Sequence, residues 1–243
     1  MVRYAYERGS PMPKIVDHDE RRREVMAAAG RVIVRDGIDA ATTRAIAKEA
    51  GYSNGVLAHY FADKDEILLS ALRQSHQRIR ARLTAKVEGA TGLAALRELL
   101  LDNLPLDDER GRETRLEVSF WSRSLTSERL AEVQRAEAAE LRAAVRHLLG
   151  QARAAGELAR DLDEDLDEDL DEDLDEDLDE DLDEDLDEDL DEDLDEDLDE
   201  DLDDLTEHLL ALVDGLSLHL LLYPGRITRE GAERIMLGAL DRR

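Results

Sequence analysis

The sequence predicts an all-α protein, and two observations support that prediction. Outside one acidic segment, apolar residues recur at the three- and four-residue spacing of helices and do not alternate as they do in strands. Only four prolines interrupt the 243 residues. The chain has no cysteine, which excludes a disulfide framework and thiolate zinc sites as sources of its stability. The expected architecture is a small N-terminal helical unit joined to a larger helical body.

The first four helices are predicted by their caps and their apolar spacing. Asp17, Thr42, Ser53 and Asp63 each stand where a side-chain oxygen can cap a helix. Gly51 suits the left-handed turn that ends a helix. The expected ranges are 17–36, 42–50, 53–61 and 63–87.

The C-terminal helices are predicted from periodic apolar stripes that stop at turn residues. Pro105 and Pro224 end two of them, because proline cannot continue a helix. The expected ranges are 92–104, 108–125, 127–155, 204–222 and 229–241.

The acidity of the chain belongs to one segment. Residues 161–204 are eleven consecutive tetrapeptides, ten of them Asp-Leu-Asp-Glu and the last Asp-Leu-Asp-Asp. With three negative charges in each unit, the segment carries −33, whereas the whole chain carries −30, so the other 199 residues carry +3. A nucleic-acid partner is therefore not excluded.

The repeat is predicted to be disordered, because like charges fill three of every four positions. In a helix its leucines would advance by about 40° per unit and form no buried face. An acidic partner-binding or DNA-mimicking tract, a weak calcium-binding tract and neutral expansion of an existing loop all remain open, and we favour expansion. The predicted division of the chain is a flexible N-terminus at 1–16, a small helical domain at 17–62, a helical body at 63–160 and 205–243, and the insertion at 161–204.

The segment 42–64 has the spacing of a helix-turn-helix, with two short helices around Gly51. In such a pair the second helix enters the major groove, and side chains near its start meet base edges. Ser53 and Asn54 are the candidates for base contacts, and Gly55 allows close approach. For the phosphates we expect Thr42, Thr43, Arg44 and Lys64. Arg21, Arg22 and Arg23 either extend the phosphate contacts or form a solvated face.

The same segment resembles the TetR family of bacterial transcriptional regulators. The resemblance rests on Gly37-Ile-Asp-Ala-Ala-Thr42, Ala50-Gly51, Ser53-x-Gly55, Tyr60-Phe61 and Lys64. Many members have tyrosine where this chain has Ala58, and Ala58-His59-Tyr60-Phe61 is similar to the BetI-like branch. The resemblance adds His59 and Tyr60 as candidates for contacts to the DNA backbone.

The resemblance also implies a homodimer built on the last two helices and a small-molecule effector inside the body. The expected partner-facing stripe is Leu209, Leu212, Val213, Leu216 and Leu220. Effector-pocket candidates are Asn103, Glu117, Phe120 and Trp121, with Arg115 as a further polar candidate; ordinary core packing is the alternative for Phe120 and Trp121. The histidines other than His59 are predicted to be ordinary helix residues. No effector, cofactor or metal is indicated.

The leading functional hypothesis is a dimeric repressor that binds a double-stranded DNA operator and is released by a small-molecule effector. The alternative is an interaction protein that does not bind DNA and uses the acidic repeat to capture basic partners. An enzyme is third, because no phosphate-binding loop, dinucleotide fingerprint or nucleophile elbow occurs. The apolar run 209–223 is shorter than a membrane span, and residues 1–14 lack the apolar core of a signal peptide, so a cytoplasmic, nucleoid-associated protein without a membrane partner is expected.

Overall fold

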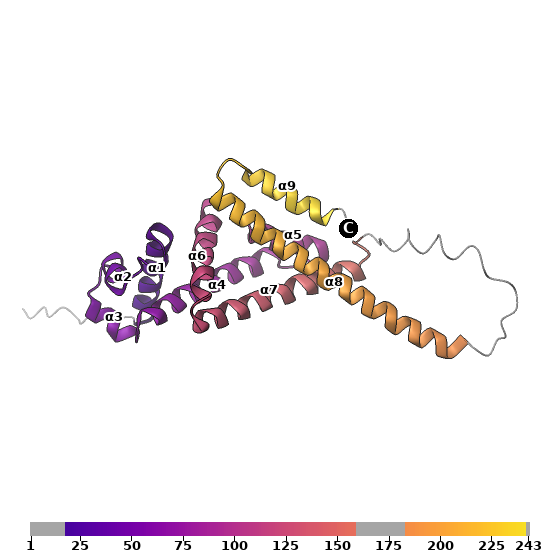
Figure 1. Ribbon diagram of the computed structural model, residues 1–243, viewed down its shortest axis with the longest axis horizontal. Helices are drawn as coiled ribbons and strands as arrows, with labels where there is room; N and C mark the ends of the chain where they lie inside the picture. The colour runs from indigo at the N-terminus through magenta and orange to yellow at the C-terminus, as the bar shows by residue number, and fades with distance from the viewer. Residues whose placement is uncertain (1–17, 159–182, 242–243) are drawn as a thin grey trace, which may run out of the picture.

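The computed structural model describes residues 18–158 and 183–241, with side chains described up to residue 158 and from residue 201. Helices make up the regular structure of these ranges (Figure 1). They are α1 (His18–Asp36), α2 (Thr43–Ala50), α3 (Asn54–Tyr60), α4 (Lys64–Lys86), α5 (Gly92–Asp102), α6 (Asp108–Ser124), α7 (Glu128–Ala154), α8 (Asp183–Leu222) and α9 (Arg229–Leu240). The all-α prediction is confirmed.

The N-terminal helices begin where the sequence places caps. The Ala45 N–H donates to Thr42 Oγ1 at 3.1 Å, and the Val56 N–H donates to Ser53 Oγ at 3.4 Å. Gly51 has φ of 75°, the left-handed conformation that glycine adopts without strain. The Thr42 bond fixes the start of α2, and Gly51 with the Ser53 bond fixes the turn between α2 and α3. The predicted cap Asp17 lies outside the described residues.

The first core cluster joins the N-terminal helices to the body. Buried residues of α1 to α3 pack with Ile67, Leu68 and Leu72 from the first half of α4. Phe120 of α6 and Leu130 of α7 belong to the same cluster. The N-terminal helices therefore rest on α4 and α6 rather than on a separate core.

The second core cluster is formed by α5, α7, α8 and α9. In Figure 1 α6, α7 and α8 outline a triangle, α4 crosses α6 into it, and α9 lies along the outer side of α8. α4 is shared, because its first half lies in the first cluster and Leu83 packs against the second.

The expected start of the helix at residue 204 is wrong, because helix α8 begins at Asp183. Its last repeat unit belongs to the body: Leu202 is 5% exposed within the second core cluster, and Asp203 pairs with Arg146 at 2.6 Å. Because extending a formed helix costs far less than nucleating one, this packed unit provides a base for the preceding turns. Repeat residues 161–182 lie outside the described residues.

Residues Asp201–Leu222 of α8 are long and apolar enough to cross a membrane by length and composition alone. The same stretch buries Leu209 and Val213 against neighbouring helices of the body. Core helices of soluble proteins meet the same criterion, so the finding carries little weight.

A buried ion-pair network fixes α4 to α5 and α6. The Asp102 carboxylate has no exposed surface; Arg82 donates to it at 2.8 and 2.9 Å, and Lys86 at 2.5 Å. Arg82 also donates to Glu113 at 2.8 Å. Burial raises the pKa of Asp102, but the bonds from Arg82 and Lys86 outweigh burial and hold it below its usual value. The network thus keeps the carboxylate charged.

Replacing Asp102 by Asn should lower the free energy of unfolding by about 2 kcal/mol, less than for a fully buried pair because Arg82 and Lys86 are partly exposed. Because the folded-state pKa is lowered, the stabilisation is complete above about pH 4 and is lost as pH falls through that lowered pKa. Denaturant unfolding of both forms measures this. Exposed Glu88→Gln is the control, and an Asp102→Asn loss that does not shrink toward acid pH would contradict the assignment.

Deleting residues 165–200 should leave the thermal midpoint and the oligomeric state unchanged. The deletion keeps the unit 201–204, whose Leu202 and Asp203 contact the body, while it removes 27 negative charges. Closing a shorter loop also costs slightly less entropy. Circular dichroism and light scattering on both chains test this, and a lower midpoint after deletion would show that the repeat itself stabilises the fold.

Candidate DNA-binding surface and ligand cavity

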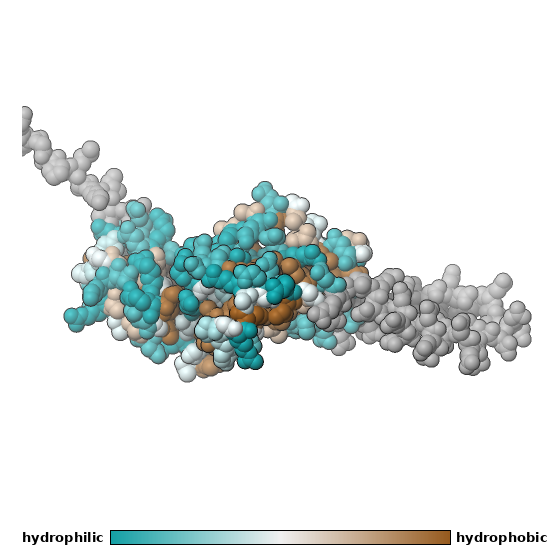
Figure 2. Space-filling model, turned by 90° about the horizontal axis from the view of Figure 1, so that it is seen from above, coloured by the Kyte–Doolittle hydropathy of each residue, from teal (hydrophilic) through white to brown (hydrophobic). Residues whose placement is uncertain are grey.

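The residues predicted to meet DNA lie together on α2, α3 and the start of α4. Arg44, Ser53, Asn54 and His59 are exposed, as is Thr42. Thr43, Tyr60 and Lys64 are half-buried. The N-terminal domain shows a mostly polar surface in Figure 2. Hydroxyl, amide and cationic side chains therefore lie together on α2, α3 and the start of α4, and these are the side chains that contact DNA in complexes.

The two cap hydroxyls have a free proton in this arrangement. Thr42 and Ser53 use their side-chain oxygens to accept backbone N–H groups. Each hydroxyl can still donate, and a phosphate oxygen is a suitable acceptor. Gly55 is exposed, and a Cβ built there would have its nearest neighbour, Ser53 Oγ, at 3.8 Å. The fold itself therefore has room for a side chain at this position.

A histidine and tyrosine cluster lies beside this surface. The rings of His59 and Tyr60 are 5.2 Å apart, and His18 lies 6.1 and 5.5 Å from them. Together with Arg21 and Ser53 these residues line a shallow hollow. The sequence analysis missed His18, because it lies on α1 and meets the rings of α3 only in the folded chain.

Arg22 has a role that neither sequence interpretation covers. It donates to the Tyr60 carbonyl, its guanidinium lies 4.4 Å from the centre of the Phe61 ring, and it pairs with Glu66 at 3.4 Å. These contacts hold the end of α3 against α4. Arg22 is therefore a positioning residue of the domain.

A cavity of about 900 Å³ lies in the body between α4, α5, α6, α7 and α8. Of the effector-pocket candidates, Asn103, Glu117 and Trp121 line it. Phe120 does not: it is fully buried in the first core cluster, one residue away from Trp121 and on another face of α6. The pocket assignment of Phe120 is wrong. Arg115 is exposed and is not part of the lining.

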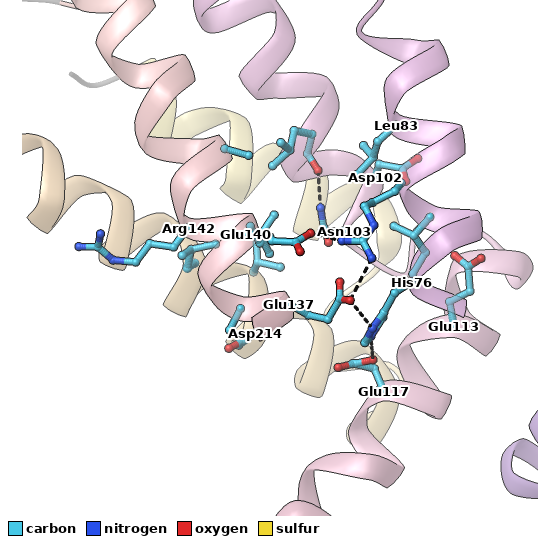
Figure 3. Close-up of a pocket in the computed structure, with 18 of the residues that line it drawn as sticks. His76, Leu83, Asp102, Asn103, Glu113, Glu117, Glu137, Glu140, Arg142 and Asp214 are labelled. Carbon is cyan, nitrogen blue, oxygen red and sulfur yellow. Dashed lines mark hydrogen bonds and ion pairs between the residues drawn. The ribbon is translucent and has the colours of Figure 1, made fainter. Parts of the chain in front are cut away.

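His76 connects α4 to the carboxylates of this cavity, a role the sequence did not indicate (Figure 3). Its Nε2 lies 2.9 Å from Glu117 Oε2, and its Nδ1 lies 3.3 Å from Glu137 Oε1, an ion-pair distance without hydrogen-bond geometry. Arg80, one turn along α4, donates to Glu137 at 3.0 Å and pairs with Glu140. Glu117 is 41 residues from His76 in the sequence, so no short-range sequence pattern could predict the pair.

Most of the predicted dimer stripe faces inward. Leu209, Val213 and Leu216 are buried in the second core cluster of one chain, so they are not free to meet a partner. Leu212 and Leu220 are half-buried. An apolar face predicts burial but does not say against what, and here most of it packs against the chain's own helices.

Family models match both the N-terminal and the C-terminal part of the chain. Residues 25–71 match the family model of bacterial regulatory proteins of the tetR family. Residues 92–170 and 167–243 match the model of the BetI-type transcriptional repressor C-terminal region, which together is more than half of the chain. The chain belongs to the TetR family. The two C-terminal matches overlap inside the repeat, as expected for a segment inserted into a continuous family domain.

Curated relatives of this TetR-family chain are matched over only part of their lengths. The transcriptional regulator PksA of Bacillus subtilis (strain 168) is 36% identical over 110 residues, which cover 45% of this chain and 54% of that protein. The regulator BetI of Stenotrophomonas maltophilia (strain R551-3) is 35% identical over 128 residues, covering 51% and 65%. The chain thus spans about half to two thirds of each.

Solved structures share the fold over nearly the whole chain. A transcriptional regulator of Rhodococcus sp. Rha1 superposes with a TM-score of 0.66 at 25% identity, covering 91% of this chain and 96% of that one. A putative transcriptional regulator of Saccharomonospora viridis, solved in complex with choline, gives 0.72 at 20% identity, covering 92% and 96%. At that identity the second likeness concerns the fold alone.

The His76 ion pairs should make stability depend on pH near neutrality. Burial lowers the pKa of His76, but the bond to Glu117 and the charges of Glu117 and Glu137 outweigh it and raise the pKa above its usual value. The stabilisation is therefore complete below about pH 6.5 and is lost as pH rises through the raised pKa. Replacing His76 by Gln should lower the thermal midpoint more at about pH 6 than at about pH 8.5.

Exposed His208 on α8 supplies the control, His208→Gln, which should show no such difference. A His76→Gln loss that is equal at both pH values would mean that packing, and not charge, is what His76 contributes.

Proposed function

We propose that the chain is a dimeric, DNA-binding transcriptional repressor whose affinity for its operator is lowered by a small molecule bound in the cavity. The observation that carries this proposal is that helix α4 joins the DNA-binding domain to the cavity wall. Its first half is packed into the DNA-binding domain, and its second half is held by ion pairs to the cavity wall. TetR-family membership and the names of the relatives support the regulatory role.

In this proposal α3 enters the major groove. Ser53 and Asn54 meet base edges, and the exposed Gly55 lets the helix approach the groove. The phosphate contacts come from Thr42, Thr43, Arg44 and Lys64, with His59 and Tyr60 beside them. The hollow that includes His18 and Arg21 extends this surface toward the start of α1.

Dimerisation is assigned to the outward faces of α8 and α9. Leu222, Tyr223 and Ile235 are 58, 49 and 46% exposed, which is unusual for large apolar side chains. Ala211 and Gly215 are exposed on α8 and allow a second helix to approach closely. Figure 2 shows apolar residues gathered over the C-terminal body, in contrast to the polar N-terminal domain. We assign the dimer interface to this surface and not to the buried leucines of the stripe predicted from the sequence.

A ligand would act through α4. Repositioning of Glu117, Glu137 or Glu140 alters the anchors of His76 and Arg80, and the N-terminal domain moves with α4 because they share a core. In a dimer this changes the separation of the two α3 helices, which must match half-sites in the major groove. The proposed place of action is the cytoplasm.

The placement of α8 bears on one form of the alternative function, in which the acidic repeat covers the DNA-binding surface of its own chain. The Asp183 end of α8 points away from α1 to α3 at the opposite end of the molecule (Figure 1). Within one chain the described part of the repeat therefore does not cover the DNA-binding surface.

Two substitutions should separate phosphate contact from base recognition. Lys64→Ala should weaken binding to all duplexes and lower the slope of log affinity against log salt by about one unit. Asn54→Ala should cost about 1–3 kcal/mol on the selected operator and change preference among sequences. The operator is first selected from genomic fragments bound by the wild-type chain.

Exposed Arg112 on α6 provides a matched loss of charge away from this surface, and Arg112→Ala should leave both quantities unchanged. If Lys64→Ala and Asn54→Ala bind the operator like the wild type, α2 and α3 are not the DNA-binding elements.

A further inference from the structure

Among the described residues, one carboxylate of the cavity lining, that of Asp214, forms no ion pair. Each arginine of the lining is already paired: Arg80 with Glu137 and Glu140, Arg110 with Asp107, Arg135 with Glu128, and Arg142 with Asp203 and Glu207. Asp214 of α8 also lines the cavity, yet no ion pair or hydrogen bond reaches its side chain from the residues that the structure describes. Figure 3 shows dashed lines from His76 to Glu117 and Glu137, and none to Asp214.

Two further polar groups of the lining lack partners among the described residues. Ser217 lies three residues after Asp214 on α8; it is 3% exposed, and its Oγ makes no hydrogen bond. The Nε2 of Gln134 on α7 is likewise buried and unpaired. Buried polar atoms are nearly always hydrogen-bonded in folded proteins, by protein, water or ligand. These atoms therefore mark where a polar ligand group fits.

Two carboxyl groups, those of Asp214 and Glu117, lie close enough at this end of the cavity to influence each other. Burial and the neighbouring charge of Glu117 both raise the pKa of Asp214. Asp214 is exposed on α8 and also belongs to the cavity lining, so it stands where the cavity meets solvent. These carboxylates would repel an anionic ligand and attract a cationic one.

We propose that this end of the cavity binds a protonated primary or secondary amine, whose N–H groups donate to Asp214, Glu117 and Ser217. N–H donors are favoured because the vacant acceptors are carboxylate and hydroxyl oxygens, which bind charged donors strongly. A quaternary ammonium has no N–H to donate and is bound mainly by the faces of several aromatic rings. Among the described lining residues, Trp121 is the one Phe, Tyr or Trp side chain. The amide of Gln134 is left for a polar group elsewhere on the ligand.

A bound amine would affect helix α4 through its contact with Glu117. The same carboxylate holds His76 at 2.9 Å, so a bound ammonium competes with His76 for it. This regulatory consequence rests on the proposed function, whereas binding of the amine does not.

The chain's single tryptophan, Trp121, lines the cavity and allows binding to be followed by its fluorescence. The full-length chain is titrated with ethanolamine, with its N-trimethyl analogue choline and with spermidine, a larger amine; calorimetry confirms each titration. We expect saturable binding of an amine and binding of choline that is weaker than that of ethanolamine by about tenfold, the value of a charged hydrogen bond. Choline bound as tightly as ethanolamine, or no binding of either amine, would overturn the proposal.

Variants locate the site. Asp214→Asn should weaken amine binding by about tenfold, while Asp204→Asn, exposed ten residues earlier on α8, should leave it unchanged. Ser217→Ala should weaken binding without lowering the thermal midpoint, because its Oγ has no partner to lose. Unchanged amine binding by Asp214→Asn would refute the assignment. Amine binding with this pattern but without an effect on operator affinity would support the site and reject the proposed regulation.

Discussion

The contacts of helix α4 with the cavity wall are the interactions on which the rest of the arrangement depends. The first half of α4 contributes Ile67, Leu68 and Leu72 to the core of the DNA-binding domain. Its second half places Arg82 on the buried Asp102 and His76 on Glu117. Apolar packing fixes α4 to one region and paired charges fix it to the other. Because an unpaired buried charge costs free energy, moving or neutralising either carboxylate favours a shift in the position of α4.

The parts of the fold that depend on neighbouring residues were predictable from sequence. Caps at Thr42, Ser53 and Asp63 and the left-handed turn at Gly51 are decided by side chains within a few positions. The exposure of Asn54 followed from the same short-range spacing. The ends of α1 to α7 and of α9 therefore agree closely with expectation.

The parts that depend on distant residues were not predictable. The leucines of α8 were recognised as apolar, but Leu216 packs into its own chain and not toward a partner, because periodicity does not name the surface that covers a face. Trp121 and its neighbour Phe120 differ in role for the same reason. The repeat was judged from its composition, yet contacts of Leu202 with the body continue the helix into it. His76 acquires its role from Glu117, on another helix.

The central claim is that the carboxylates of the cavity wall set the position of the DNA-binding domain through α4. Operator affinity of Glu137→Gln tests it most directly, since Glu137 pairs with both His76 and Arg80 and lies on α7, outside the predicted DNA-binding elements. Glu132→Gln, an exposed position on the same helix, is the matched control. The account predicts that Glu137→Gln weakens operator binding by about tenfold, while Glu132→Gln does not. Equal affinity of both variants and the wild type would contradict it.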